Sequence, residues 1–196
     1  MITPAQFAAA LIATATDFVG LVETQSNAAW DDPKTVASEK AKSDLLVRTM
    51  RRVSGWAPGS PYCAAFDGAM VILTFERLGQ ADAATRFAKL WTAHCMTNVR
   101  KLKAAGRLAS EPVVGGLMLF RHGLTDKGHA AITAGIDGVY PNRMLANIEG
   151  NTSSGQAGSQ REGDGIFLRA RNVRQNGDLV TQGWLSPSDL LALVGA

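Results

Sequence analysis

The feature that most constrains the fold of this chain is a change in its hydrophobic pattern near Pro112. Before this point, apolar residues recur three or four positions apart over long segments, which is the spacing of helices. After it, they form short runs bounded by glycine, at 116–121, 129–136, 144–150 and 166–171, which is typical of strands. Helices followed by consecutive strands predict an α+β domain with an antiparallel sheet.

The helical pattern divides into several segments. The first begins at Thr3, because Pro4 suits a first turn and Gln6 stands three residues after a capping hydroxyl. Its apolar positions are Phe7, Leu11, Phe18 and Val22. Further helices are expected from Asp32–Pro33 to about Val53, from near Cys63 to Gly79, over 81–105 as one helix or two, and from Ser186 onward.

The length of 196 residues predicts one domain over 1–196. Its expected parts are a helical N-terminal part at 1–54, a helix carrying Cys63 within 55–80, and a sheet at 112–172. The two cysteines, Cys63 and Cys95, make no disulfide framework, and a reduced state is the simpler interpretation, although one bridge between them stays open.

The charge and hydropathy of the chain limit the kinds of partner that we expect it to bind. The formal net charge is +3, with Lys and Arg scattered along the chain, so no nucleic-acid partner is expected. No apolar run reaches the roughly 18 residues of a transmembrane helix. The Ala-rich N-terminus has no Lys or Arg before its apolar part, so it is interpreted as a helix and not as a signal peptide.

Cys63 is the first candidate for chemistry. It follows the Gly- and Pro-rich turn 54–61 and begins a buried helix, where free N–H groups and the helix dipole favour a thiolate. The same N–H groups can hold the oxyanion of an attacked carbonyl. The alternative interpretation is a small buried apolar residue, the usual place of a free cysteine.

His129 begins the strand that follows the turn 125–128, so its ring can face another element and act as the base for a thiol. His94, which we place within a helix, and His122, which we place in a loop, are interpreted as structural or solvated. A zinc site at His94 and Cys95 lacks a familiar ligand spacing, so neither a metal nor any other cofactor is expected.

The third candidate component is the segment 148–151. Residues two apart in a strand share a face, so we expect Glu149 and Asn151 to point to the same side and Ile148 to point into the core. A carboxylate or amide there can fix the tautomer and orientation of His129. The alternative is a pair of solvated residues at a strand end.

With Cys, His and Glu-x-Asn in this order, the chain resembles the CHAP and NlpC/P60 group of papain-like amidases and peptidases, which cut bacterial cell-wall peptides. The stretches that carry the resemblance are PYCAAF (61–66), GHAAITAGI (128–136), NIEGNTSSG (147–155) and, less directly, VGLVETQSN (19–27). Around them the resemblance extends over about half of the chain, chiefly 19–30, 55–75 and 115–170. Three departures are Gly116, where Asp is usual, Tyr62, where Trp is common, and a long helical insert at 80–110.

The resemblance implies a papain-like fold, with the helix of Cys63 packed on the antiparallel sheet. It also implies catalysis by Cys63, His129, Glu149 and Asn151, with the Tyr62 hydroxyl near the oxyanion or simply packed. The expected partner is peptidoglycan or its peptide fragments. Without a signal peptide, such an enzyme is expected to reach the wall through a holin or a secretion system, as a phage lysin or an effector.

Two other functions stay open. The first is a cytoplasmic amidase acting on a small peptide conjugate, since the same three groups serve both reactions. The second is a non-catalytic binding module of the same fold, for which the thiol of Cys63 is expected to be inert. The sequence leaves both candidate bonds open, the one between the sugar and the first amino acid and one within the peptide.

Overall fold

The computed structural model describes residues 2–22, 37–138, 143–152 and 165–196. The helices are α1 (Pro4–Thr16), α2 (Ala37–Met50), α3 (Cys63–Arg77), α4 (Ala81–Leu90), α5 (Cys95–Ala104) and α6 (Pro187–Val194). The strands are β1 (Leu117–His122), β2 (Gly128–Asp137), β3 (Met144–Thr152), β4 (Gly165–Asn172), β5 (Gln175–Asn176) and β6 (Leu179–Leu185).

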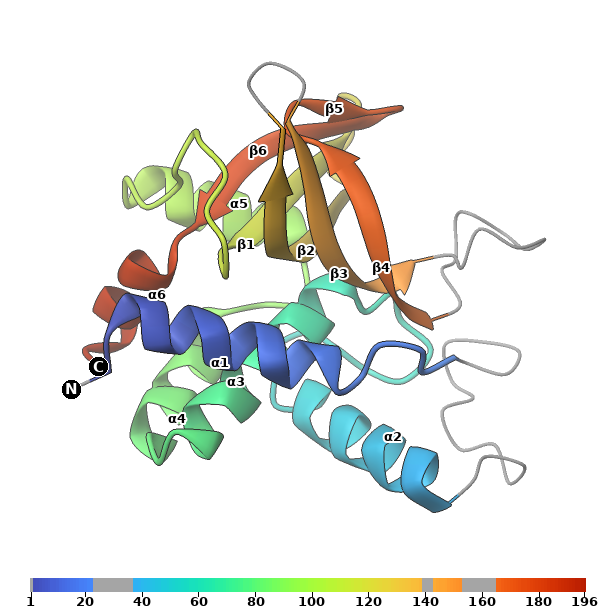
Figure 1. The fold of residues 1–196 in the computed structure, drawn as a ribbon, viewed down its shortest axis with the longest axis vertical. Helices are drawn as coiled ribbons and strands as arrows, with labels where there is room; N and C mark the ends of the chain where they lie inside the picture. Colours follow the sequence, from blue (N-terminus) through green and yellow to red (C-terminus); the bar gives the residue numbers. More distant parts are fainter. Residues whose placement is uncertain (1, 23–36, 139–142, 153–164) are drawn as a thin grey trace.

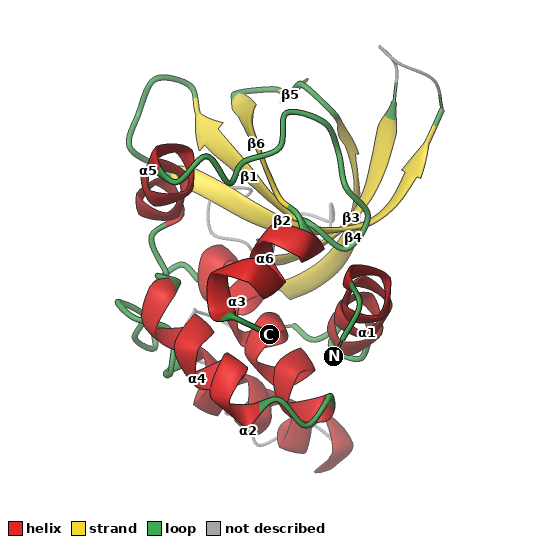
Figure 2. Cartoon of the chain, turned by 90° about the vertical axis from the view of Figure 1, so that its left-hand side faces the viewer, coloured by secondary structure: helices red, strands yellow, loops and turns green. Residues whose placement is uncertain are grey.

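The strands form one antiparallel, curled sheet in the order β4-β3-β2-β1-β6-β5. Most of the helices gather on one side of it, and Figure 1 shows α1 crossing beneath the strands. Figure 2 shows α5 apart from the other helices, beside β1. Helix α3 packs on β2 and β3, whereas α5 packs on β1 and β2. The α+β class predicted from the sequence is therefore confirmed.

The sheet buries apolar side chains on both faces, because strand side chains alternate. One face supplies residues such as Leu119, Ala130 and Ile148 to the main core, which it shares with the helices. The other face has a smaller core, made by Met118, Phe120, Ala131, Leu145, Val173, Leu179 and Trp184. Ile148 thus points into the main core, as predicted, and Glu149 points to the opposite face.

The N-terminal helix follows its sequence signals. Thr3 accepts a hydrogen bond from the Gln6 N–H, and the Gln6 side chain accepts one from the Thr3 N–H, which completes the capping box. The helix ends at Thr16, earlier than the apolar pattern suggested. Phe18 is buried in the turn beyond it, but Val22 is exposed, so the prediction that Val22 extends the apolar face is wrong.

Several other helix and strand boundaries differ from those predicted from the sequence. The pattern at 81–105 forms two helices, α4 and α5, and His94 caps the second instead of lying within a helix. Strands β5 and β6 were not predicted. The expected start of the second helix at Asp32–Pro33, most of the segment 19–27 and the last three residues of the segment 147–155 lie outside the described residues. No described helix combines the length and apolar character needed to cross a membrane.

Candidate active site

Cys63 is the first residue of α3 and is 8% exposed. The preceding residue, Tyr62, makes no side-chain hydrogen bond to the helix end, so the first N–H groups of α3 are not capped by it. The backbone of Ala64, in the same turn, and that of Ala130, on β2, both hydrogen-bond the Cys63 sulfur and lower its pKa. Since only a donor stabilises a thiolate, these groups are N–H donors. The helix start is therefore built to hold negative charge.

His129, the second residue of β2, lies between Cys63 and Glu149. Its side chain is hydrogen-bonded to Cys63, and its Nε2 atom lies 2.9 Å from Oε2 of Glu149. Because Nε2 is engaged by the carboxylate, Nδ1 is the ring nitrogen left for the sulfur. Phe120 lies beside the ring, with centroids 6.0 Å apart. This arrangement orients the imidazole between a nucleophile and a carboxylate.

Glu149 is fully buried on β3, yet both of its carboxylate oxygens are hydrogen-bonded. Besides His129 at Oε2, Arg171 of β4 contacts Oε1 through Nε at 2.7 Å and Oε2 through Nη2 at 2.6 Å. A fork of this kind is the strongest common arrangement for an Arg and a carboxylate. Two cations thus compensate the cost of burying the Glu149 charge.

The ionisation of these groups follows from their contacts. Burial raises the pKa of Cys63, but the hydrogen bond and charge of His129, with the backbone hydrogen bonds of Ala130 and Ala64, together lower it below its ordinary value. Burial lowers the pKa of His129, but Glu149 and Cys63 raise it to about 10. Burial raises the pKa of Glu149, but Arg171 and His129 lower it to about 2. Each of the three groups therefore favours the ionised form of its neighbour, as thiolate, imidazolium and carboxylate.

Two glycines let the helices approach the strands that carry these groups. A Cβ atom at Gly150 would lie 2.6 Å from the Phe66 ring, so glycine is needed where β3 meets α3. A Cβ atom at Gly128 would lie 2.6 Å from the Phe120 carbonyl oxygen and 2.9 Å from Cys95 Sγ. Each glycine adjoins a site residue, so the close packing positions both His129 and Glu149.

Asn151 does not follow the alternation that predicted it. The register of β3 against β4 shifts between Gly150 and Thr152, and Asn151 lies at this bulge with φ 54°. Its Oδ1 atom is buried, with no hydrogen-bond partner in the part of the chain that the structure describes. The same-face expectation assumed a regular strand, and the bulge removes its basis. In the described part of the chain, Glu149 and not Asn151 is hydrogen-bonded to His129.

Tyr62 is placed by packing. It is fully buried and belongs to the main core. Trp56 and Trp91, two further aromatic residues near the Cys63 helix, are also buried, and Trp91 Nε1 donates to the Ala64 carbonyl at 2.7 Å. Trp91 therefore supports the first turn of α3 from within the core.

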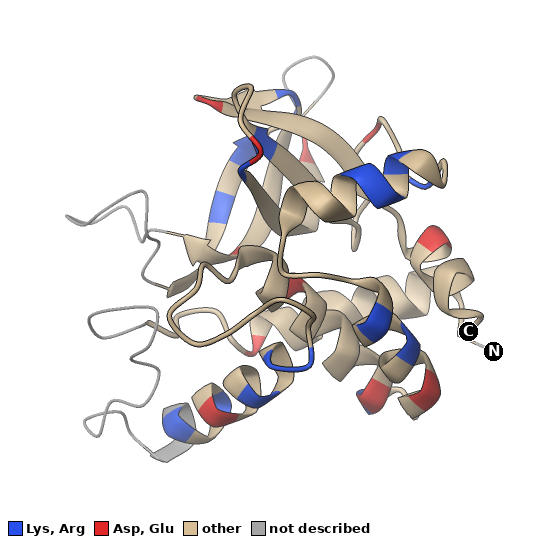
Figure 3. Ribbon diagram, turned by 180° about the vertical axis from the view of Figure 1, so that it is seen from behind, with Lys and Arg blue, Asp and Glu red and all other residues tan. Residues whose placement is uncertain are grey.

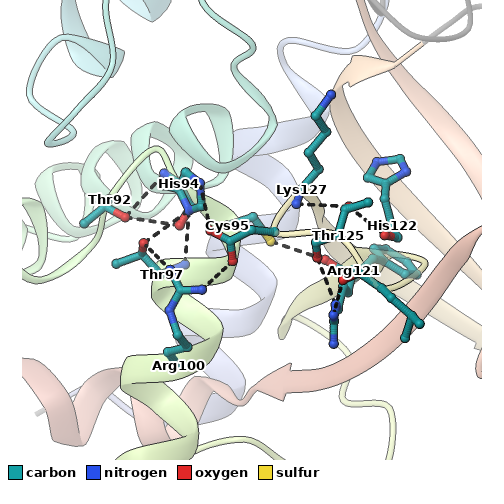
Figure 4. A network of polar contacts seen from close by, with 12 residues as sticks. Thr92, His94, Cys95, Thr97, Arg100, Arg121, His122, Thr125 and Lys127 are labelled. Carbon is teal, nitrogen blue, oxygen red and sulfur yellow. Dashed lines mark hydrogen bonds and ion pairs between the residues drawn. The ribbon is translucent and has the colours of Figure 1, made fainter.

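The remaining histidines belong to a separate polar network at α5 and the β1–β2 turn (Figure 4). His94 caps α5 by accepting the Thr97 N–H at Nδ1, over 3.3 Å. His122 Nδ1 lies 3.0 Å from Oδ2 of Asp178. Cys95 joins this network to the site, since its thiol donates to the His129 carbonyl at 3.1 Å. Both cysteines are free and buried.

The sequence interpretation missed two groups at the site. Arg171 is one of two arginines on β4, and nothing in its spacing distinguishes it from Arg169. Asp67 is fully buried, and neither carboxylate oxygen has a hydrogen-bond partner among the residues described. Burial and the charges of Cys63 and Glu149 raise its pKa, against a smaller opposing effect of His129. The sequence signal that could have placed Asp67 near the site is its position one helical turn after Cys63.

Figure 3 marks the charged positions along the ribbon, where Lys and Arg are interspersed with Asp and Glu. The described residues contain no group of three or more His, Cys, Asp or Glu side chains placed to hold a metal ion. Comparisons with protein-family models, with curated proteins and with solved structures found no match.

Proposed function

We propose that this protein is a cysteine hydrolase with a papain-like arrangement of helix and sheet, which cleaves an amide or peptide bond in peptidoglycan. The observation that supports the chemistry best is the position of His129, hydrogen-bonded to Cys63 and 2.9 Å from Glu149. A nucleophile, a base and a group that orients the base are the recurring elements of covalent hydrolysis.

In the first half of the reaction, the Cys63 thiolate attacks the carbonyl carbon of the scissile bond. The carbonyl oxygen becomes an oxyanion next to the first turn of α3, which the Tyr62 side chain does not cap and where N–H groups can stabilise it. The C–N bond then breaks, and the imidazolium of His129 gives its proton to the departing amine. A thioester on Cys63 and a neutral imidazole are left.

In the second half, water attacks the thioester carbon and His129 takes the proton of that water. The C–S bond breaks, the carboxylic acid product leaves, and the thiolate and imidazolium are restored. Glu149 keeps the ring in place during both halves and stabilises its positive charge, as the carboxylate of a catalytic triad does.

The choice of peptidoglycan depends on the resemblance of the Cys63, His129 and Glu149 motifs to the CHAP and NlpC/P60 group. A mildly basic chain, with a net charge of +3, also suits an anionic wall polymer. The biological setting that we propose is a phage lysin or a secreted effector, delivered to the wall by a holin or a secretion system.

The test is loss of turbidity of purified cell walls, with mass spectrometry of the released fragments. Wild-type protein is expected to release muropeptides, whereas Cys63→Ala and His129→Gln are expected to be inactive. His122→Gln is the matched control, because His122 is exposed and paired with Asp178 outside the site. Undiminished lysis by Cys63→Ala would refute the mechanism, and a reactive Cys63 without muropeptide release would favour the amidase on small conjugates.

A further inference from the structure

Arg171 holds the carboxylate of Glu149 from the side opposite His129. Its guanidinium contacts both oxygens, at 2.7 and 2.6 Å, and its side chain is 16% exposed. The contact joins β4 to β3, whereas the His129 contact joins β3 to β2. Three neighbouring strands thus converge on one buried carboxylate.

The register of the sheet makes this contact specific. Arg171 is paired with Leu145, while Glu149 is paired with Phe167, so the Arg171 side chain reaches along the sheet to meet Glu149. It lies on the face of the smaller core, because its register partner Leu145 belongs to that core. A long side chain held in this way loses rotamer freedom, and the fork must offset that cost.

We propose that Arg171 is a positioning residue of the Cys63 site, acting through Glu149 and His129. The proposal deepens the proposed function and rests on it, because it assigns a role in the same hydrolysis. Arg171 Nε holds Oε1, so the carboxylate plane is fixed and Oε2 is aimed at the imidazole. Without Arg171, the carboxylate can turn away, and His129 loses its orientation toward Cys63.

Charge supports the same role. Thiolate, imidazolium, carboxylate and guanidinium alternate in sign along Cys63, His129, Glu149 and Arg171. Among the described residues, Asp67 of α3 and Cys95 of α5 are the other titratable groups that interact with Cys63, and the pKa of each is raised, so each favours its neutral form. Removing the guanidinium leaves one net negative charge in a buried site, which raises the pKa of Glu149 and disfavours the Cys63 thiolate.

The experiment follows the alkylation of Cys63 by iodoacetamide from pH 4 to 9, which needs no substrate, together with wall hydrolysis. Arg171→Gln is expected to move the acid limb of Cys63 alkylation upward by about 1 pH unit, which is about tenfold slower labelling below that limb. Arg171→Lys keeps a charge but has no fork, so a smaller shift is expected, with kcat reduced more than KM is raised. Arg169→Gln is the matched control, since Arg169 is on the same strand and is paired with Asn147.

A wild-type profile for folded Arg171→Gln would overturn the proposal. If Arg171→Gln does not fold, Arg171→Lys becomes the deciding variant. An alkylation profile and a kcat equal to those of the wild type in Arg171→Lys would then overturn the proposal. A shift in both variants, and none in Arg169→Gln, supports it. If the shift occurs but wild-type protein does not hydrolyse walls, the proposed substrate fails while the role of Arg171 in the site stands.

Discussion

The thiol of Cys95 donates a hydrogen bond to the carbonyl oxygen of His129, with the sulfur and oxygen 3.1 Å apart. The next backbone N–H along the chain, that of Ala130, is hydrogen-bonded to Cys63. One peptide group therefore lies between the two cysteines and contacts each through a different atom. The contact with a carbonyl favours a protonated Cys95, whereas the contact with an N–H favours an ionised Cys63.

This contrast predicts very different reactivity for the two thiols. Burial, with the nearby Cys63 and Asp67 charges, raises the pKa of Cys95, while the pKa of Cys63 is lowered. At pH 7, iodoacetamide is expected to label Cys63 at least tenfold faster than Cys95, because the thiolate is the reactive form. Peptide mapping by mass spectrometry measures both rates in one sample. Equal labelling of the two in folded protein would contradict the ionisation described here.

Glu149→Gln is expected to lower kcat/KM by about 10³–10⁴-fold, because an amide does not stabilise the imidazolium of His129. The pKa of His129, about 10 in the wild type, should fall toward or below its ordinary value of 6.5, since the raising effect of Glu149 is lost and burial remains. The alkaline limit of activity should therefore move to lower pH. The measurement is the pH dependence of kcat/KM.

Glu76→Gln provides the control for that variant. Glu76 forms an ion pair with Arg52 over 2.6 Å, but both side chains are 37% exposed and lie outside the site. Its kcat/KM is expected to stay within about twofold of the wild type, since exposed ion pairs contribute little. A similar loss in both variants would show that charge removal in general, and not the orientation of His129, explains the effect.

Asp67→Asn is expected to become more stable relative to the wild type as pH rises. The pKa of Asp67 is raised in the folded protein, so the native state keeps a proton that the unfolded chain loses above about pH 4. Wild-type stability then declines by about 1.4 kcal/mol per pH unit through this group, until Asp67 itself ionises. The asparagine has no such dependence. Urea unfolding of both proteins at pH 4 to 8 checks this, and a constant difference would contradict it.

Gly150→Ala is expected to destabilise the fold by about 1–3 kcal/mol, because the added methyl group meets the Phe66 ring. It should also reduce activity, since Glu149 is the adjacent residue. Gly135→Ala is the matched strand control: its Cβ would be 3.7 Å from that of Ala146, an ordinary contact, so a change within about 0.5 kcal/mol is expected. Thermal unfolding of both variants measures the difference.

The sequence predicted those parts of the fold in which local chemistry and tertiary packing agree. The capping box at Thr3 and Gln6 starts α1 as expected, and the apolar spacing after Cys63 matches α3. Strand β6 was missed because Thr181, Gln182 and Gly183 interrupt any apolar alternation, and Gly183 adopts φ 133°. Its pairing with β1, and not its own composition, makes it a strand.

The site was predictable to the same degree. Cys63, His129 and Glu149 carry motif signals, and the structure brings these three together. Arg171 carries none, because its contact depends on the register of β4 and on the curl of the sheet. The prediction that Asn151 shares a face with Glu149 assumed a single regular strand. The bulge at Asn151 depends on the pairing of β3 with β4, which the alternation rule does not include.

The central place of β1 has a consequence for how the protein forms. One edge of β1 pairs with β2 through a short turn, but the other pairs with β6, which is made much later in synthesis. Until residues 179–185 leave the ribosome, the apolar strand 117–120 has an open edge that other chains can join. Such non-local pairing also slows folding. The sheet that carries His129 is therefore completed only after residues 179–185 have been made.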